Sequence, residues 1–282
     1  MSFREIHPFK VIKTTGEREP FNEDKLEKSL LNAGADEKTS QDIINQIRKE
    51  LKPITPTSKI YADALRMLSQ KDRYVVARYS LKKAVRALGP TGFPFEKLVR
   101  EVYNKKGYTA VTGIFVTGKC ATHEVDVLGI KDGHAMAVEA KFHNQAGLKS
   151  DLKVALYVKA RFEDIMGTVV NLPGANRSPI TECHLITNTK FTETAIGYAQ
   201  CANLSLIGWN YPDKGNLHDL IQEHRVHPVT CLRNLHESHA KKLVEQNIIF
   251  IRQILGNPDV LDQFNMGGTA KNSIIREIQG II

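Results

Sequence analysis

The sequence of 282 residues contains no long hydrophobic run. Its start, MSFREIHPFK, has no apolar core of the length that a signal peptide needs. No stretch approaches the roughly 18 consecutive apolar residues of a membrane-spanning helix. These absences argue against secretion and membrane insertion, so we expect a cytoplasmic protein that has no membrane partner.

Cysteine is also scarce and widely spaced. The four cysteines are Cys120, Cys183, Cys201 and Cys231, and none forms a C-x-x-C pair. This spacing suggests neither a disulfide framework nor a four-sulfur zinc site, and we expect reduced thiols. The chain has no internal repeat, no low-complexity tract and no glycine-rich loop of the Walker type.

Basic residues exceed acidic ones. The chain has 39 lysines and arginines against 31 acidic residues, a net charge of +8, and residues 1–95 hold 18 basic and 12 acidic residues. This excess favours a polyanionic partner such as nucleic acid. The hydrophobic content of 41% is ordinary for a globular protein with a core.

Changes in pattern along the chain predict three domains, over residues 1–90, 91–222 and 223–282. Helical periodicity ends near ALGPTGFP, strands then alternate with helices, and the last segment consists of short helices. We therefore expect a multidomain α+β and α/β fold. It would consist of an N-terminal β-hairpin with a helical bundle, a central mixed sheet flanked by helices, and a small helical C-terminal domain.

The stretch FKVIKTTGEREPF alternates on both sides of a glycine, which predicts a β-hairpin. Helices are expected after it: one starts at Asn22 as N-cap, one lies in TSKIYADALRMLSQ, and one covers residues 72–88. Residues 9–88, from the motif VIKTTGEREPF to ARYSLKKAV, resemble the ATP-cone, a nucleotide-sensing domain known from ribonucleotide reductases.

The ATP-cone resemblance implies a bound effector, ATP or dATP, and assigns it to Val11, Lys13 and Lys25. The two lysines would meet triphosphate oxygens as point charges. The sequence departs from the family signature at Thr14, where an arginine is expected. The alternative is that this segment is a structural or dimerising module.

The stretch HEVDVLGIKDGHAMAVEAK predicts a second hairpin, with Asp132 and Gly133 as the central residues of a type I′ turn. In that register Leu128 faces Ala137, Asp126 faces Glu139, and Glu124 faces Lys141. Because opposed side chains lie about 5 Å apart, Asp126 and Glu139 could share one divalent cation. Lys141 would lie on the same face as Glu139, since alternate strand residues share a face. The alternative is an exposed hairpin with solubilising charges.

This pattern resembles the Mrr-like branch of the PD-(D/E)xK nucleases over residues 91–222. The family triad corresponds to Asp126, Glu139 and Lys141, with Val125 in place of the signature proline. The opening helix in FPFEKLVREVYNKKGYTAV supplies Glu96, with Glu101 as a weaker candidate. Further blocks, CHLITNTKFTETAIGYAQ and LSLIGWNYPDKGNLHDLI, match later strands and helices of the family.

The resemblance implies a Mg²⁺-dependent or Mn²⁺-dependent DNA endonuclease. Asp126 and Glu139 would ligate the metal with the Ala140 carbonyl, Lys141 would position the water, and Glu96 would assist. Double-stranded or branched DNA is the expected partner, and a homodimer is possible. The alternatives are a nucleotide-responsive DNA-binding regulator that does not cleave, and RNA as the substrate.

Residues 223–282 predict short helices joined at GNPD and MGGTAKN. This segment loosely resembles helix-hairpin-helix modules, in which backbone N–H groups bind DNA phosphates. A helical cap on the nuclease domain is the equal alternative.

Overall fold

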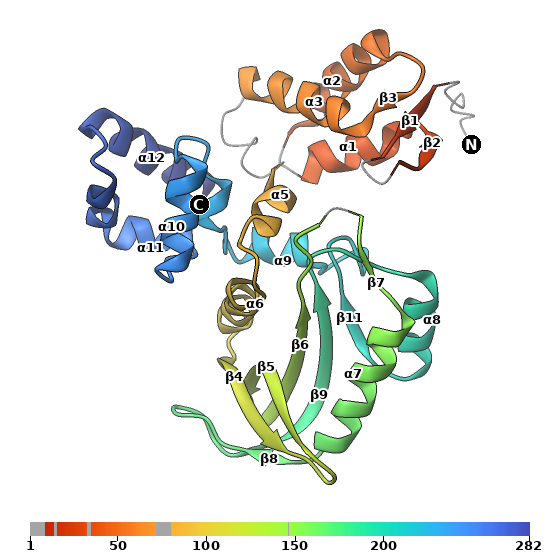
Figure 1. Ribbon diagram of the computed structural model, residues 1–282, viewed down its shortest axis with the longest axis vertical. Helices are drawn as coiled ribbons and strands as arrows, with labels where there is room; N and C mark the ends of the chain where they lie inside the picture. Colours follow the sequence, from red (N-terminus) through yellow and green to blue (C-terminus); the bar gives the residue numbers. More distant parts are fainter. Residues whose placement is uncertain (1–8, 14–15, 33–34, 72–79, 146) are drawn as a thin grey trace. The chain divides into compact units, whose positions relative to one another are not determined.

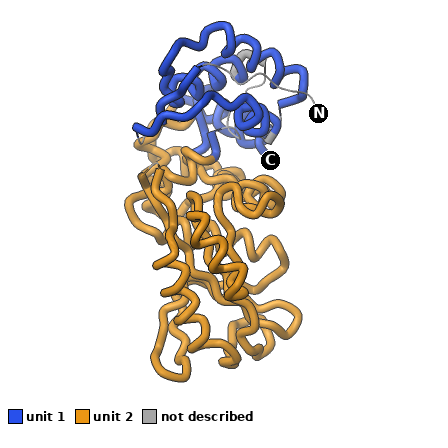
Figure 2. Tube along the Cα trace, turned by 90° about the vertical axis from the view of Figure 1, so that its right-hand side faces the viewer, with its two compact units in different colours: residues 1–81, 231–234, 267–282 blue, residues 82–230, 235–266 orange. Residues whose placement is uncertain are grey.

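The protein has two compact units, seen in a computed structural model that describes residues 9–13, 16–32, 35–71, 80–145 and 147–282 (Figure 2). The first unit contains residues 1–81, 231–234 and 267–282, and the second contains residues 82–230 and 235–266. No helix in the described part of the chain is long and apolar enough to cross a membrane. The predicted fold class is confirmed, whereas the domain boundaries at residues 90 and 222 stay a prediction.

The first unit contains the predicted N-terminal hairpin and its helices (Figure 1). Strand β1 (Lys10–Ile12) pairs antiparallel with β2 (Arg18–Pro20) and parallel with β3 (Thr55–Pro56). The helices of this unit are α1 (Glu23–Asn32), α2 (Glu37–Glu50), α3 (Thr57–Lys71) and α12 (Gly268–Ile281).

Local signals explain where the helices of the first unit start. The Asn22 side chain accepts the Lys25 N–H at 2.8 Å, which confirms it as the N-cap of α1. The Asp36 side chain caps α2 in the same way. Helix α3 buries Ile60, Ala64 and Leu68 on one face, as its periodicity predicts. Residues 14, 15 and 72–79 of the predicted elements lie outside the described part.

The second unit is built around a mixed sheet. Its strands are β4 (Thr109–Thr117), β5 (Thr122–Lys131), β6 (His134–Lys141), β8 (Val169–Val170), β9 (Ser178–Thr187) and β11 (Ser205–Ile207), with a short pair β7 (Lys149–Ser150) and β10 (Lys190–Phe191). Its helices are α6 (Phe93–Lys105), α7 (Leu152–Ile165), α8 (Glu193–Cys201), α9 (Leu217–Glu223), α10 (Glu237–Glu245) and α11 (Ile251–Gly256), with the 3₁₀ helix η2 (Pro258–Phe264). The 3₁₀ helix η1 (Val229–Cys231) crosses into the first unit at Cys231. Helix α5 (Leu81–Arg86) begins at the boundary of the two units.

The central sheet has the strand order β11-β9-β6-β5-β4, with β8 added beside β9. Neighbours β4, β5 and β6 are antiparallel, and β6, β9 and β11 are parallel. Helices α7 and α8 pack on one face, where Val158 and Ala195 join the core with Leu185 of β9. The adjacent His184 contacts Tyr103, so α6 covers the other face.

The β5–β6 hairpin has the predicted turn and register. Asp132 and Gly133 both have positive φ, 51° and 78°, as a type I′ turn requires. Ile130 pairs with Ala135 and Leu128 with Ala137. The ladder ends at the pair Val127 and Val138, so the expected pairs Asp126 with Glu139 and Glu124 with Lys141 do not belong to it.

A kink at Asp126 explains why the ladder ends there. Val125 and Leu128 both belong to the core under α7, although strict alternation would place them on opposite faces. On β4 the ladder skips Gly113, which lies opposite Asp126 and has a φ of 66°, and it resumes at Ile114 with Val125. Glycine in a strand often marks such an irregularity. Gly113 therefore permits the bend that redirects Asp126.

We expect Gly113→Ala to lower the free energy of unfolding by about 1 to 2 kcal/mol, because alanine is strained at positive φ. An added Cβ would meet no atom within 4 Å, so strain is the main cost. Gly197→Ala, in helix α8 and equally open, should instead stabilise by about 0.5 to 1 kcal/mol. Urea unfolding measures both variants. Stabilisation by Gly113→Ala would contradict the kink.

Candidate functional site

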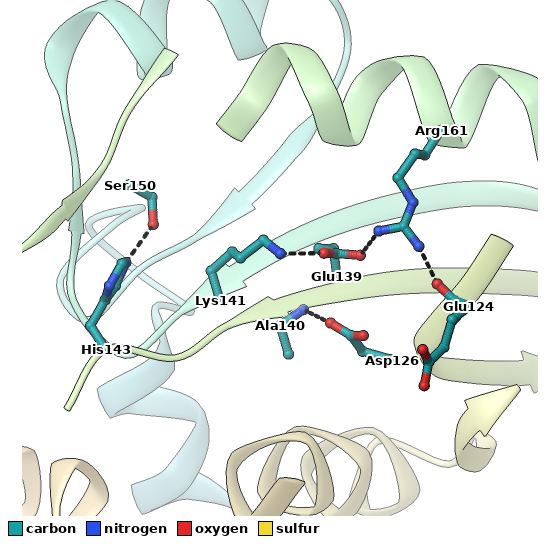
Figure 3. A network of polar contacts seen from close by, with 8 residues as sticks. All are labelled: Glu124, Asp126, Glu139, Ala140, Lys141, His143, Ser150 and Arg161. Atoms are coloured by element: carbon teal, nitrogen blue, oxygen red, sulfur yellow. Dashed lines mark hydrogen bonds and ion pairs between the residues drawn. The ribbon is translucent and has the colours of Figure 1, made fainter. Parts of the chain in front are cut away.

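The Glu139 side chain, 5% exposed, lies between two cations (Figure 3). One oxygen, Oε1, lies 2.5 Å from Lys141 Nζ, and the other, Oε2, lies 2.6 Å from Arg161 Nη1. Lys141 therefore shares a face with Glu139, as the spacing predicts. Arg161 comes from α7 and also donates to the Glu124 carbonyl, so it joins the helix to two strands.

The Asp126 side chain is held differently. Its Oδ2 accepts the Ala140 N–H at 2.7 Å, beside the end of the β5–β6 ladder (Figure 3). Burial and repulsion from Glu139 raise the pKa of Asp126 to about 6, although the Ala140 hydrogen bond opposes the shift. Asp126 and Glu139 thus interact electrostatically, even though the ladder stops one pair short of them.

Glu96 on α6 belongs to the same electrostatic cluster. Burial raises its pKa to about 7, and repulsion from Asp126, Glu124 and Glu139 adds to the effect. We call Glu96, Glu124, Asp126 and Glu139 the carboxylate cluster. Crowded carboxylates with raised pKa values mark a place where an added positive charge is favourable.

The donor set of the carboxylate cluster suits a hard divalent cation. Carboxylate and carbonyl oxygens are the ligands that Mg²⁺ and Mn²⁺ prefer. Within the described residues, no three His, Cys, Asp or Glu side chains gather as a metal-binding group. Mg²⁺ does not need three, because it keeps several waters and is commonly held by one or two carboxylates together with substrate phosphates.

The remaining residues predicted for this site are placed as follows. Glu101, the weaker candidate on α6, lies 3.9 Å from Lys105 one helical turn away. Ala140 donates its N–H to Asp126, while a role for its carbonyl stays a prediction. Arg161 was missed by the sequence reasoning. Nothing local in the sequence distinguishes it from Lys153 and Lys159, the other cations of α7.

The segment after Lys141 is anchored by Asn188, which follows β9 and is buried. Asn188 Oδ1 accepts the His143 N–H and Asn188 Nδ2 donates to the His143 carbonyl, both at 2.8 Å. The His143 ring lies 3.2 Å from Ser150 Oγ, and burial, followed by the charge of Lys141, lowers its pKa. These bonds hold the end of β6 in place.

In the first unit, the predicted lysines meet at one carboxylate. Lys13 Nζ lies 2.8 Å from Glu19 and 3.0 Å from Glu17, while Lys25 Nζ lies 3.6 Å from Glu19. The hydrogen bond to Glu19 is the main cause that raises the pKa of Lys13. Val11, two residues before Lys13, is buried and packs in the core of the unit. The structure therefore brings Lys13 and Lys25 together.

Comparisons with known proteins agree with this architecture. Residues 9–88 match the ATP cone domain, and residues 227–282 match the family described as AF1548-like, C-terminal. An uncharacterized protein of Archaeoglobus fulgidus is 30% identical over 177 residues, which are 62% of this chain and 95% of the relative.

The solved structure of a protein of unknown function also resembles this chain. The crystal structure of AF1548, a protein of unknown function, is 29% identical, has a TM-score of 0.52, and is matched over 68% of this chain and 98% of that one. The restriction endonuclease MspJI, solved with a 27-mer oligonucleotide, is 12% identical with a TM-score of 0.33. That match covers 71% of this chain and 39% of MspJI.

The raised pKa of Glu96 predicts a pH-dependent stability in the absence of divalent cations. Between about pH 4.5 and pH 7 the folded protein keeps a proton on Glu96 that the unfolded chain has released. Because the native state then binds more protons, its free energy of unfolding falls as pH rises through this window. Urea unfolding at several pH values in EDTA should show a shallower fall for Glu96→Gln than for the wild type.

Glu101→Gln is the matched control for this measurement, since Glu101 lies on the same helix and pairs with Lys105. It should keep the wild-type pH dependence. An identical fall in Glu96→Gln and wild type would show that Glu96 does not carry the effect.

Proposed function

The chain belongs to the AF1548-like family, and we propose that its second unit is a Mg²⁺-dependent DNA endonuclease regulated by ATP or dATP. The observation that carries this proposal is the carboxylate cluster, in which buried Glu139 contacts Lys141 and Arg161 beside Asp126. Metal-dependent phosphodiester hydrolysis requires carboxylates that bind a divalent cation and positively charged side chains that contact the phosphate. The carboxylate cluster and its neighbours supply both kinds of group.

Asp126 and Glu139 would hold the metal, with the Ala140 carbonyl, and Glu96 would assist through a bound water. Mn²⁺ fits the same oxygen donors. When bound, the cation would neutralise charge on the phosphate and lower the pKa of a coordinated water. The raised pKa values of Asp126 and Glu96 support this assignment, because a cation would relieve the repulsion that raises them.

Lys141 orients the attacking water and stabilises negative charge that develops on the phosphate oxygens. The water loses one proton as its oxygen forms a bond to phosphorus, the bond from phosphorus to the leaving oxygen breaks, and the leaving oxygen takes up one proton, so that protons balance. Arg161 positions Glu139 and fixes α7 against the strands. Asn188 supports Lys141 by holding the backbone of His143, two residues after it.

The first unit supplies the proposed regulation. Part of it matches the ATP cone domain. Its Lys13 and Lys25 both form ion pairs with the Glu19 carboxylate at the surface. A triphosphate that binds these lysines would replace Glu19 as their partner. DNA cleavage would then respond to the level of ATP or dATP.

Glu139→Gln and Lys141→Met should each reduce Mg²⁺-dependent DNA cleavage at least about 100-fold. The first removes a carboxylate that would hold the metal, and the second removes the cation that orients the water and stabilises charge on the phosphate. The assay incubates the protein with supercoiled, branched, methylated and single-stranded DNA, with and without Mg²⁺ and ATP. Glu101→Gln should cleave as the wild type does.

Full cleavage by both variants would contradict the assigned roles. Binding of DNA without cleavage by the wild type under all conditions would favour a nucleotide-responsive regulator with a non-cleaving fold. Cleavage of RNA but not DNA would identify RNA as the substrate.

Lys13→Met should weaken ATP or dATP binding about 10-fold to 100-fold, the usual effect of losing one charge-assisted hydrogen bond. Isothermal titration calorimetry measures the affinity. Lys28→Met, an exposed lysine on α1, is the control and should bind as the wild type does. Absence of heat and of thermal stabilisation with the wild type would refute nucleotide binding.

A further inference from the structure

A groove of about 500 Å³ lies beside the carboxylate cluster, between α7 and the turn that joins β4 to β5. Lys119, Cys120 and His123 line it from the turn and β5, and Tyr157, Arg161 and Asp164 line it from α7. Its volume lies within the range of about 300 to 1,000 Å³ that is typical of small-molecule sites.

The wall of the groove is held by Asp164. Its carboxylate accepts the N–H groups of Cys120 and Ala121, at 2.7 and 3.0 Å, and lies 2.8 Å from His123 Nε2. A Cβ on Gly118 would lie 2.3 Å from Asp164 Oδ2, so this close approach requires glycine. Two acids line the groove: Asp164 is engaged by the turn, and Glu163 Oε1 lies 3.5 Å from Lys159 Nζ. Both acids are therefore paired, and Arg161 and Lys119 are the cations that a ligand meets.

An aromatic side chain is open to solvent in the groove. Tyr157 is 58% exposed, and the Arg161 guanidinium lies 5.4 Å from the centre of its ring. The same guanidinium bonds Glu139, so a single side chain belongs to both the groove and the carboxylate cluster. A ligand stacked on Tyr157 would thus lie next to a phosphate bound at that cluster.

We propose that this groove receives an unpaired nucleobase of the DNA strand that is cut, stacked on Tyr157. The proposal rests on the proposed nuclease function and names its substrate class. A flat aromatic ligand attached to a phosphate fits an exposed ring flanked by cations, because bases stack on aromatic side chains and arginine attracts both their faces and their phosphates. A paired base inside a duplex cannot use the ring, since its neighbours cover both of its faces. The preferred DNA therefore has an unpaired nucleotide at the cleavage point, as in a branch or flap.

The test measures DNA binding in EDTA, so that cleavage plays no part. Two DNAs of the same sequence carry 2-aminopurine at one position, unpaired in a branched DNA and paired in a duplex. Tyr157→Ala should bind the branched DNA about 10-fold more weakly, the usual effect of removing one stacking ring, and should bind the duplex as the wild type does. Tyr157→Phe keeps the ring and should bind both DNAs as the wild type does.

Fluorescence of the probe provides a second readout. Stacking on Tyr157 should quench the unpaired 2-aminopurine in the wild type and in Tyr157→Phe, but not in Tyr157→Ala. Phe115→Ala is the control, because Phe115 is an exposed aromatic residue on β4 that does not line the groove.

Equal affinity of wild type and Tyr157→Ala for the branched DNA, or an equal loss for both DNAs, would overturn the proposal. The binding result is independent of the cleavage assay. A protein that shows the Tyr157 effect but never cleaves would refute the nuclease function and leave the base site standing. A protein that cleaves DNA without the Tyr157 effect would support the nuclease function and overturn the base site.

Discussion

The arrangement of the second unit depends on the two ion pairs of the buried Glu139 carboxylate. Removing a carboxylate from water costs several kcal/mol, and the cost is met only by close opposite charges and hydrogen bonds. Lys141 and Arg161 provide these, one on each oxygen. Because Arg161 comes from α7 and also donates to the Glu124 carbonyl, the second oxygen of Glu139 gains its partner only when helix and strands are assembled. Asp126 and Glu96 respond in another way, since burial and repulsion raise their pKa values.

This arrangement links the proposed metal site to the surrounding cations. A divalent cation on Glu139 would compete with Lys141 and Arg161 for the same oxygens, and each of these side chains could then turn toward a phosphate. The cation would also favour the ionised forms of Asp126 and Glu96. Metal binding, proton release and the exposure of positive charge to DNA are therefore one coupled process.

Short-range features of the sequence predicted the β5–β6 hairpin, because the Asp132-Gly133 turn determines the register and strand alternation places Lys141 beside Glu139. The kink at Asp126 could not be derived in this way, since it depends on how Gly113 of the neighbouring strand bends. Arg161 was missed because its contact with Glu139 spans 22 residues and exists only after α7 packs on the sheet. Glu96 and the ATP-cone lysines were found by family resemblance rather than by a local pattern.

In both units, the cationic side chains proposed to bind phosphate form ion pairs with a carboxylate, but the ion pairs of the two units differ in strength. The pairs of Lys13 and Lys25 with Glu19 are at the surface, and such pairs contribute about 0 to 1 kcal/mol. An incoming triphosphate can therefore replace Glu19 at little cost. Breaking a buried pair by removing one partner costs about 3 to 5 kcal/mol, because an uncompensated charge remains. A DNA phosphate alone cannot draw the cations away from Glu139 so easily. We infer that a divalent cation must occupy Glu139 as the phosphate arrives, which makes metal binding a condition for placing the phosphate for cleavage but not for stacking of a base on Tyr157.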